Sequence, residues 1–88
     1  MPTISMFFGI LIRMYCGAAE HNPPHFHAHY QGFKAVIDIE TCEFVEGNLP
    51  RKQAKYVLAW AELHKDELLA DWELASSGVE PFKIEPLR

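Results

Sequence analysis

The clearest pattern of polar and apolar positions lies between residues 25 and 40. Residues 25–30 read His-Phe-His-Ala-His-Tyr, and alternation with a period of two is typical of a strand buried on one face. Gln31 and Gly32 follow as a two-residue turn, because glycine can adopt the positive φ that such turns need. Residues 33–40 continue as a second strand. The pattern therefore predicts a β-hairpin.

The turn at Gln31-Gly32 assigns every residue of this hairpin to one of two faces. The predicted pairs on the apolar face are Tyr30 with Phe33, Ala28 with Ala35, and Phe26 with Ile37, and those on the other face are His29 with Lys34, His27 with Val36, and His25 with Asp38. A shift by one residue would mix the two sets, so burial of the apolar set specifies the register. We predict that His25, His27 and Asp38 share the polar face.

Three further segments have the composition of strands. Residues 4–15 are rich in β-branched and aromatic residues and apolar on both faces, which predicts one central strand covered on both sides. Residues 43–46 are predicted as a third strand of the meander. Residues 82–85 are predicted as a short edge strand.

Residues 50–76 carry the periodicity of an amphipathic helix, with apolar residues at steps of three and four. Asn48 is placed to cap its start. A single helix of this length would measure about 40 Å, whereas a domain of this size has a radius of gyration of roughly 12 Å. We therefore expect a break near residues 64–66, where Asp66 can cap a second helix.

Composition sets the size of the core. The chain has 88 residues, of which 49% are apolar and 23% charged, as in an ordinary globular protein. This length suffices for one core, so we predict a single domain spanning residues 1–88. The expected fold class is α+β, with a small antiparallel meander of three to four strands packed against one broken helix or two helices.

Charge and cysteine content indicate which binding partners and which cellular compartment to expect. Eight Lys and Arg residues against twelve Asp and Glu residues give a net charge of −4, which makes nucleic acid an unfavourable ligand for the chain alone. The longest apolar stretch, residues 4–12, is shorter than the about 20 residues that span a bilayer. It also does not read as a secretion signal. Cys16 and Cys42 are therefore expected as free thiols of a cytoplasmic protein.

The histidines support a metal site. His25 and His27 on one strand face would have Cα atoms about 6.7 Å apart, so both imidazoles can converge on one ion. A third ligand would come from His21 in the preceding loop, from Asp38 or from Glu20. Two histidines and a carboxylate suit zinc or iron. The predicted metal ligands are His21, His25 and His27, with a divalent ion such as zinc as the cofactor.

The same region can also act without a metal. Asp38 opposite His25 can orient one imidazole nitrogen and leave the other for general acid–base catalysis, with His27 in the complementary role. Metal-independent ribonucleases use such pairs, and Lys34 near His29 could then contact a phosphate. The predicted catalytic residues are His25, His27 and Asp38. In a third interpretation, the alternating histidines only form the solvated face of a half-buried strand.

Several motifs together resemble one protein family. They are Phe-Phe-Gly-Ile-x-Ile-x-Met-Tyr at residues 7–15, His-x-Pro-Pro-His-Phe-His-Ala-x-Tyr at residues 21–30, and Trp-Ala-x-x-His-x-x-Glu-Leu at residues 60–68. Over essentially its whole length the chain is similar to the bacterial family called domain of unknown function 4160. The resemblance implies no established activity, but it marks His21, His25 and His27 as motif positions. It also implies a frequent gene neighbour, a small protein of the family called domain of unknown function 2442, in toxin–antitoxin-like pairs.

The resemblance and the residues together give three functional hypotheses. The first is a bacterial cytoplasmic module of a toxin–antitoxin-like pair, which binds its neighbour or forms a homodimer. The second is a metal-dependent or ribonuclease-like hydrolase, and the third is a structural interaction domain without catalysis. Because the predicted helix carries a second apolar stripe, the interface is expected at Tyr56, Trp60 or Leu63.

Overall fold

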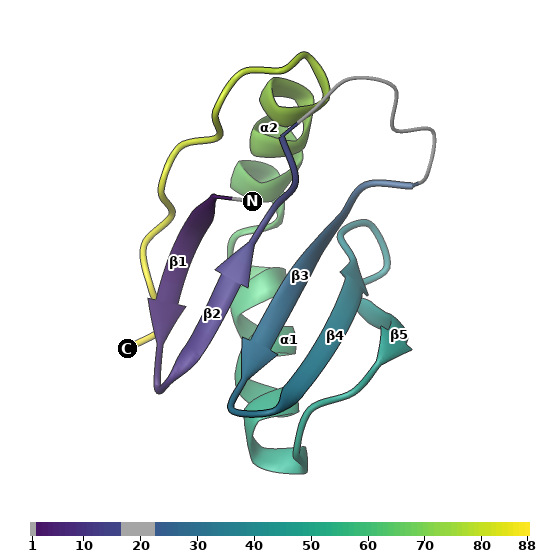
Figure 1. Cartoon of the computed structure of the whole chain (residues 1–88), viewed down its shortest axis with the longest axis vertical. Helices are drawn as coiled ribbons and strands as arrows, with labels where there is room; N and C mark the ends of the chain where they lie inside the picture. Colours follow the sequence, from purple (N-terminus) through teal and green to yellow (C-terminus); the bar gives the residue numbers. More distant parts are fainter. Residues whose placement is uncertain (1, 17–22) are drawn as a thin grey trace.

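The chain folds into a five-stranded antiparallel sheet with two helices behind one of its faces (Figure 1). The computed structural model describes residues 2–16 and 23–88. The elements are β1 (Thr3–Phe7), β2 (Ile10–Arg13), β3 (His25–Tyr30), β4 (Phe33–Asp38), β5 (Glu43–Gly47), α1 (Arg51–Leu63) and α2 (Lys65–Ser76). The strands lie in the sheet in their sequence order, as in a meander. The predicted α+β class is confirmed, with five strands in place of three to four.

The segment predicted as one central strand, residues 4–15, is instead a hairpin of β1 and β2. Phe8 has a φ of 51° and Gly9 a φ of 78°, so both turn residues are left-handed, as a type I′ turn requires. The prediction was wrong because a phenylalanine rarely adopts this conformation and its apolar side chain conceals the turn. The hairpin places β1 at the edge of the sheet, and the helices cover one face only.

The second hairpin has the predicted register. The six cross-strand pairs of β3 and β4 are His25 with Asp38, Phe26 with Ile37, His27 with Val36, Ala28 with Ala35, His29 with Lys34 and Tyr30 with Phe33. The apolar members Phe26, Ala28 and Ile37 are fully buried. The turn differs in one detail, since the positive φ, 51°, belongs to Gln31 and not to Gly32.

The helices have the predicted break but not the predicted caps. His64 separates them, with φ −117° and ψ 25°. Pro50 flanks the start of α1, so Asn48 does not cap that helix. Asp66 does not form the cap. It lies within the first turn of α2, where its negative charge interacts favourably with the positive end of the helix dipole. Among the described residues, no helix has the length and apolar character needed to cross a membrane.

Trp60 lies at the centre of the core and is fully buried. Its ring centroid is 5.4 Å from that of Phe7 and 5.7 Å from that of Phe26, so it joins α1 to two strands. Its indole N–H donates to the backbone carbonyl of Glu85 at 2.8 Å. Trp60 therefore belongs to the core, which corrects its assignment to a partner interface.

The C-terminal segment runs along the outer side of β1 (Figure 1). It is not the predicted edge strand, although Ile84 N–H donates to the carbonyl oxygen of Ile4 at 2.8 Å. Asp71 of α2, which is 3% exposed, accepts the N–H of Phe82 at 2.9 Å. Burial raises the pKa of Asp71, as does the charge of Glu67, while the hydrogen bond from Phe82 acts in the opposite direction.

Gly47 provides a test of the β4–β5 pairing. It has a φ of 67°, and a Cβ at this position would lie 2.2 Å from the carbonyl oxygen of Lys34. Gly47→Ala should therefore destabilise the protein by about 2 kcal/mol or more. Gly32→Ala is the matched control, because a Cβ there meets no atom within 4 Å, and it should change stability by less than about 0.5 kcal/mol. Urea denaturation measures both, and equal effects would contradict this pairing.

Asp71 should make stability depend on pH. Because its pKa is raised in the folded chain, the folded state binds the proton more tightly than the unfolded state. The free energy of unfolding should therefore fall as pH rises through the folded-state pKa. Asp71→Asn keeps an acceptor for the Phe82 N–H and removes the charge, so its stability relative to wild type should rise across the same window. Urea denaturation at several pH values measures this difference, with the exposed Asp66→Asn as control; a constant difference for Asp71→Asn would contradict the prediction.

Candidate functional site

The three histidines of β3 lie on the face of the sheet that the helices leave open. Phe26 and Ala28, which alternate with them, are fully buried in the core between the sheet and the helices. Successive side chains of a strand point to opposite faces, so His25, His27 and His29 lie on the face opposite Phe26 and Ala28, although His25, at the start of the strand, still contacts Trp72 of α2. All three are half-buried, and neighbouring strands flank His27 and His29 on both sides.

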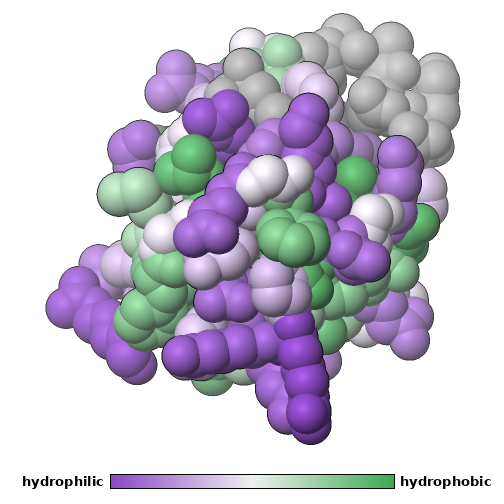
Figure 2. All heavy atoms as spheres, turned by 60° about the horizontal axis from the view of Figure 1, so that its bottom comes forward, coloured by the Kyte–Doolittle hydropathy of each residue, from purple (hydrophilic) through white to green (hydrophobic). Residues whose placement is uncertain are grey.

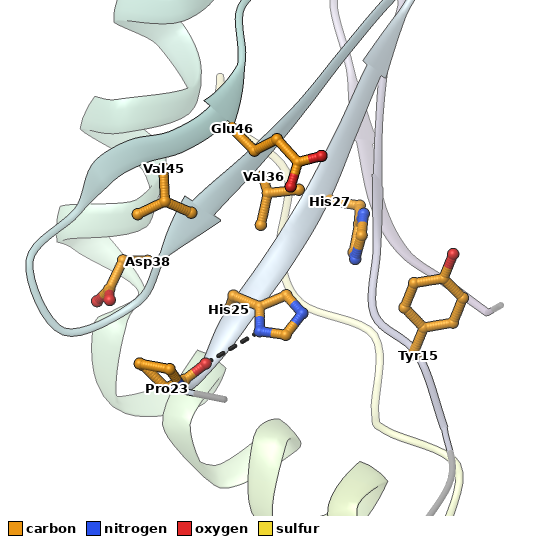
Figure 3. Close-up of a pocket in the computed structure, with 8 residues that line it drawn as sticks. All are labelled: Tyr15, Pro23, His25, His27, Val36, Asp38, Val45 and Glu46. Carbon is orange, nitrogen blue, oxygen red and sulfur yellow. Dashed lines mark hydrogen bonds between the residues drawn. The ribbon is translucent and has the colours of Figure 1, made fainter. Parts of the chain in front are cut away.

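His25 is held by a hydrogen bond to the backbone. Its Nδ1 lies 2.9 Å from the carbonyl oxygen of Pro23 (Figure 3). A carbonyl oxygen only accepts, so Nδ1 carries the hydrogen, and Nε2 of the neutral ring can take up a proton. The centroid of the ring lies 5.4 Å from that of His27 and 4.9 Å from that of Trp72 on α2. The pairing of β2 with β3 ends at His27, so β2 does not flank His25.

Asp38 lies opposite His25, as predicted, but its carboxylate is engaged elsewhere. Its Oδ1 accepts the backbone N–H groups of Glu40 at 2.8 Å and Thr41 at 3.0 Å, in the turn between β4 and β5. Figure 3 shows the carboxylate turned away from His25. Pro23 therefore takes the orienting role that the sequence analysis gave to Asp38.

A pocket of about 490 Å³ opens on this face of the sheet. It is lined by Tyr15, Pro23, His25, His27, Val36, Asp38, Val45 and Glu46 (Figure 3). The half-exposed ring of Tyr15 meets the ring of His27 edge-on, with the centroids 4.7 Å apart. Sequence reasoning missed Tyr15 and Glu46, since neither belongs to the alternating segment and only the pairing of distant strands brings them here.

A smaller depression of about 220 Å³ lies beside the pocket and shares Tyr15, His27, Val36 and Glu46 with it. His29 and Lys34, a cross-strand pair, line its other side. Burial lowers the pKa of His29, and the charges of Arg13 and Lys34 lower it further, which favours the neutral ring. Sequence reasoning missed Arg13, although a charge in an otherwise apolar strand was a signal.

Only two of the three predicted metal ligands lie within the described residues. His25 and His27 are neighbours, but His21 lies outside the described residues. Within residues 2–16 and 23–88, no group of three or more His, Cys, Asp or Glu side chains is placed to hold a metal ion. A zinc site that includes His21 stays a prediction.

The fold and this face define a small α+β protein with a one-sided sheet and a histidine-bearing pocket. A family model described as domain of unknown function 4160 matches residues 9–73, and the chain belongs to this family. The match includes β2, β3, β4 and β5 and the pocket between them. Neither a curated protein nor a solved structure matches the chain.

Proposed function

We propose that this protein is a metal-independent, ribonuclease-like hydrolase in which His25 and His27 transfer protons at a phosphodiester. The observation that carries the proposal is the pair of adjacent imidazoles beside the pocket, one of which is anchored so that a basic nitrogen remains available. Imidazole is the side chain best suited to give and take protons near neutral pH. The half-exposed ring of Tyr15 beside them supports a nucleotide substrate, because an aromatic face can stack on a base.

The roles follow from the hydrogen bond of His25. With Nδ1 donating to Pro23, Nε2 of His25 is the base that takes the proton from a ribose 2′-hydroxyl. The 2′-oxygen then forms a bond to phosphorus while the bond from phosphorus to the 5′-oxygen breaks. Protonated His27 gives its proton to the departing 5′-oxygen. The products are a 2′,3′-cyclic phosphate and a 5′-hydroxyl, and no metal takes part in these steps.

Cleavage of a labelled oligoribonucleotide tests this proposal. His25→Ala and His27→Ala should each lower kcat by about 100-fold or more, the usual contribution of general acid–base catalysis. The matched control is His64→Ala, which removes an imidazole from the helix break, where it contacts Glu67. An oligodeoxyribonucleotide should resist cleavage because it lacks the 2′-hydroxyl.

Two further arms separate the rival mechanisms. Asp38→Asn should retain activity within a few-fold, because the amide oxygen still accepts the N–H groups of the turn. Activity should also persist in EDTA, whereas loss in EDTA together with a zinc-dependent rise in melting temperature would favour a metal site with His21. Wild-type cleavage rates in both histidine variants, or no cleavage by the wild type, would overturn the proposal.

We also propose that the protein works with a small protein of the domain of unknown function 2442 family as one member of a toxin–antitoxin-like pair. Support comes from exposed apolar groups along α1: Leu63 is 70% exposed, and Tyr56, two turns earlier, contacts the exposed ring of Phe8. We call Phe8, Tyr56 and Leu63 the α1 surface. Figure 2 shows hydrophobic groups as separate patches among hydrophilic ones at the end of the molecule where the hairpin turns lie.

Co-expression tests the partnership. Expression of this chain alone should slow growth, co-expression of the neighbouring protein should relieve the effect, and His25→Ala should also relieve it if hydrolysis is the cause. Leu63→Asp should abolish co-purification of the pair, because a charge would be buried in the interface. Val79→Asp, which alters an apolar side chain 50% exposed beyond α2, is the matched control. A monomeric protein that does not co-purify with the neighbouring protein and leaves growth unchanged would contradict the prediction.

A further inference from the structure

We infer that Arg13, His29 and Lys34 form an anion subsite for a phosphate group that neighbours the scissile one. This inference deepens the proposed function, on which its choice of substrate rests. The three residues belong to three adjacent strands, β2, β3 and β4. His29 pairs directly with Lys34, and Arg13 pairs with His27, two positions from His29 on the same strand. Their side chains therefore lie on the same open face, in neighbouring positions.

Two buried nitrogen atoms in this group lack hydrogen-bond partners among the described residues. They are Nε of Arg13 and Nε2 of His29. Buried polar nitrogen atoms without partners are rare, because desolvation is costly unless a hydrogen bond replaces water. An anion with several acceptor oxygens would satisfy the Arg13 N–H and, when His29 donates through Nε2, the histidine as well.

The charges point to the same kind of ligand. Arg13 and Lys34 flank His29 on the open face, one from β2 and the other from β4. Neither cation belongs to an ion pair within residues 2–16 and 23–88, where the ion pairs join His64 to Glu67 and Arg88 to Glu85. Two positive side chains on either side of one histidine, neither of them in an ion pair in the described part of the chain, favour an anion between them.

Glu46 is the acidic residue that lines this depression. It lies on β5 opposite Val36 and is exposed, so an anion in the depression would also meet its negative charge. Its carboxylate should weaken anion binding. Glu46→Gln should therefore tighten it.

The position of the subsite selects a nucleic acid phosphate. The depression that contains His29 and Lys34 shares His27 and Tyr15 with the pocket of the histidine pair. A chain of nucleotides can place one phosphate at His25 and His27 and the next at the subsite, with a base against Tyr15. An acidic segment of a protein partner would offer carboxylates in place of phosphates, and the experiment distinguishes the two.

Titration of the isotope-labelled full chain with inorganic phosphate, at constant ionic strength, provides the binding test. NMR signals of the Arg13 Nε–H and the His29 ring should shift and saturate. Arg13→Gln and Lys34→Gln should each weaken binding by about tenfold, the effect of losing one charge-assisted hydrogen bond. Lys52→Gln removes the same charge from an exposed position at the start of α1 and should leave binding unchanged. Lys34 is itself exposed, so its variant should fold even if Arg13→Gln does not.

The oligoribonucleotide assay provides the second readout. Arg13→Gln and Lys34→Gln should raise KM by about tenfold and change kcat little, because the subsite does not touch the reacting atoms. His25→Ala should retain phosphate binding. If phosphate binds but no RNA is cleaved, the subsite stands and the proposed function fails. If RNA is cleaved and neither variant alters phosphate binding or KM, or if a polyglutamate peptide binds while phosphate does not, the subsite is overturned.

Discussion

The pairing of β3 with β4 is the constraint on which the rest of the structure depends. It places Phe26, Ala28 and Ile37 under the helices, and their complete burial makes any other register costly, because a shift by one residue would expose them all. The same pairing places the three histidines of β3 on the opposite face of the sheet. Burial of one set of side chains against Trp60 thus places the other set on the open face, where the hydrogen bond to Pro23 orients His25.

Much of this arrangement could be predicted from the chain because it follows from local periodicity. The alternation of residues 25–30, the turn at residues 31–32 and the length limit on the helical segment each depend on neighbouring residues alone. The hairpin register, the third strand of the meander and the helix break were predicted for this reason. The exposed and buried sides of β3 followed from them.

The features that sequence reasoning missed depend on contacts between distant segments or on conformations that the residues disfavour. Phe8 adopts a left-handed turn against its own preference, so an apolar run concealed two strands. Asp38 was correctly placed opposite His25, but the backbone N–H groups of its own turn compete for its carboxylate, and spacing alone cannot decide such a competition. Arg13 lies beside the histidines only because β2 pairs with β3, and this pairing joins segments that are distant in the sequence.

The composition of the open face supports the proposal that it binds a ligand. Its strands could carry Thr or Ser and still alternate correctly, yet they place Arg13, three histidines and Lys34 on adjacent positions. Gathering basic groups in this way works against folding, since positive charges repel one another and two buried atoms, Nε of Arg13 and Nε2 of His29, lose water. Departures of this kind from the rules for a stable surface concentrate at functional sites, where a bound group restores the missing interactions. The opposite face of β3 and β4, which packs against the helices, carries the aliphatic and aromatic residues Phe26, Ala28, Ala35 and Ile37. The contrast between the two faces of one hairpin, in alternating residues of the same strands, supports the proposal of a bound substrate.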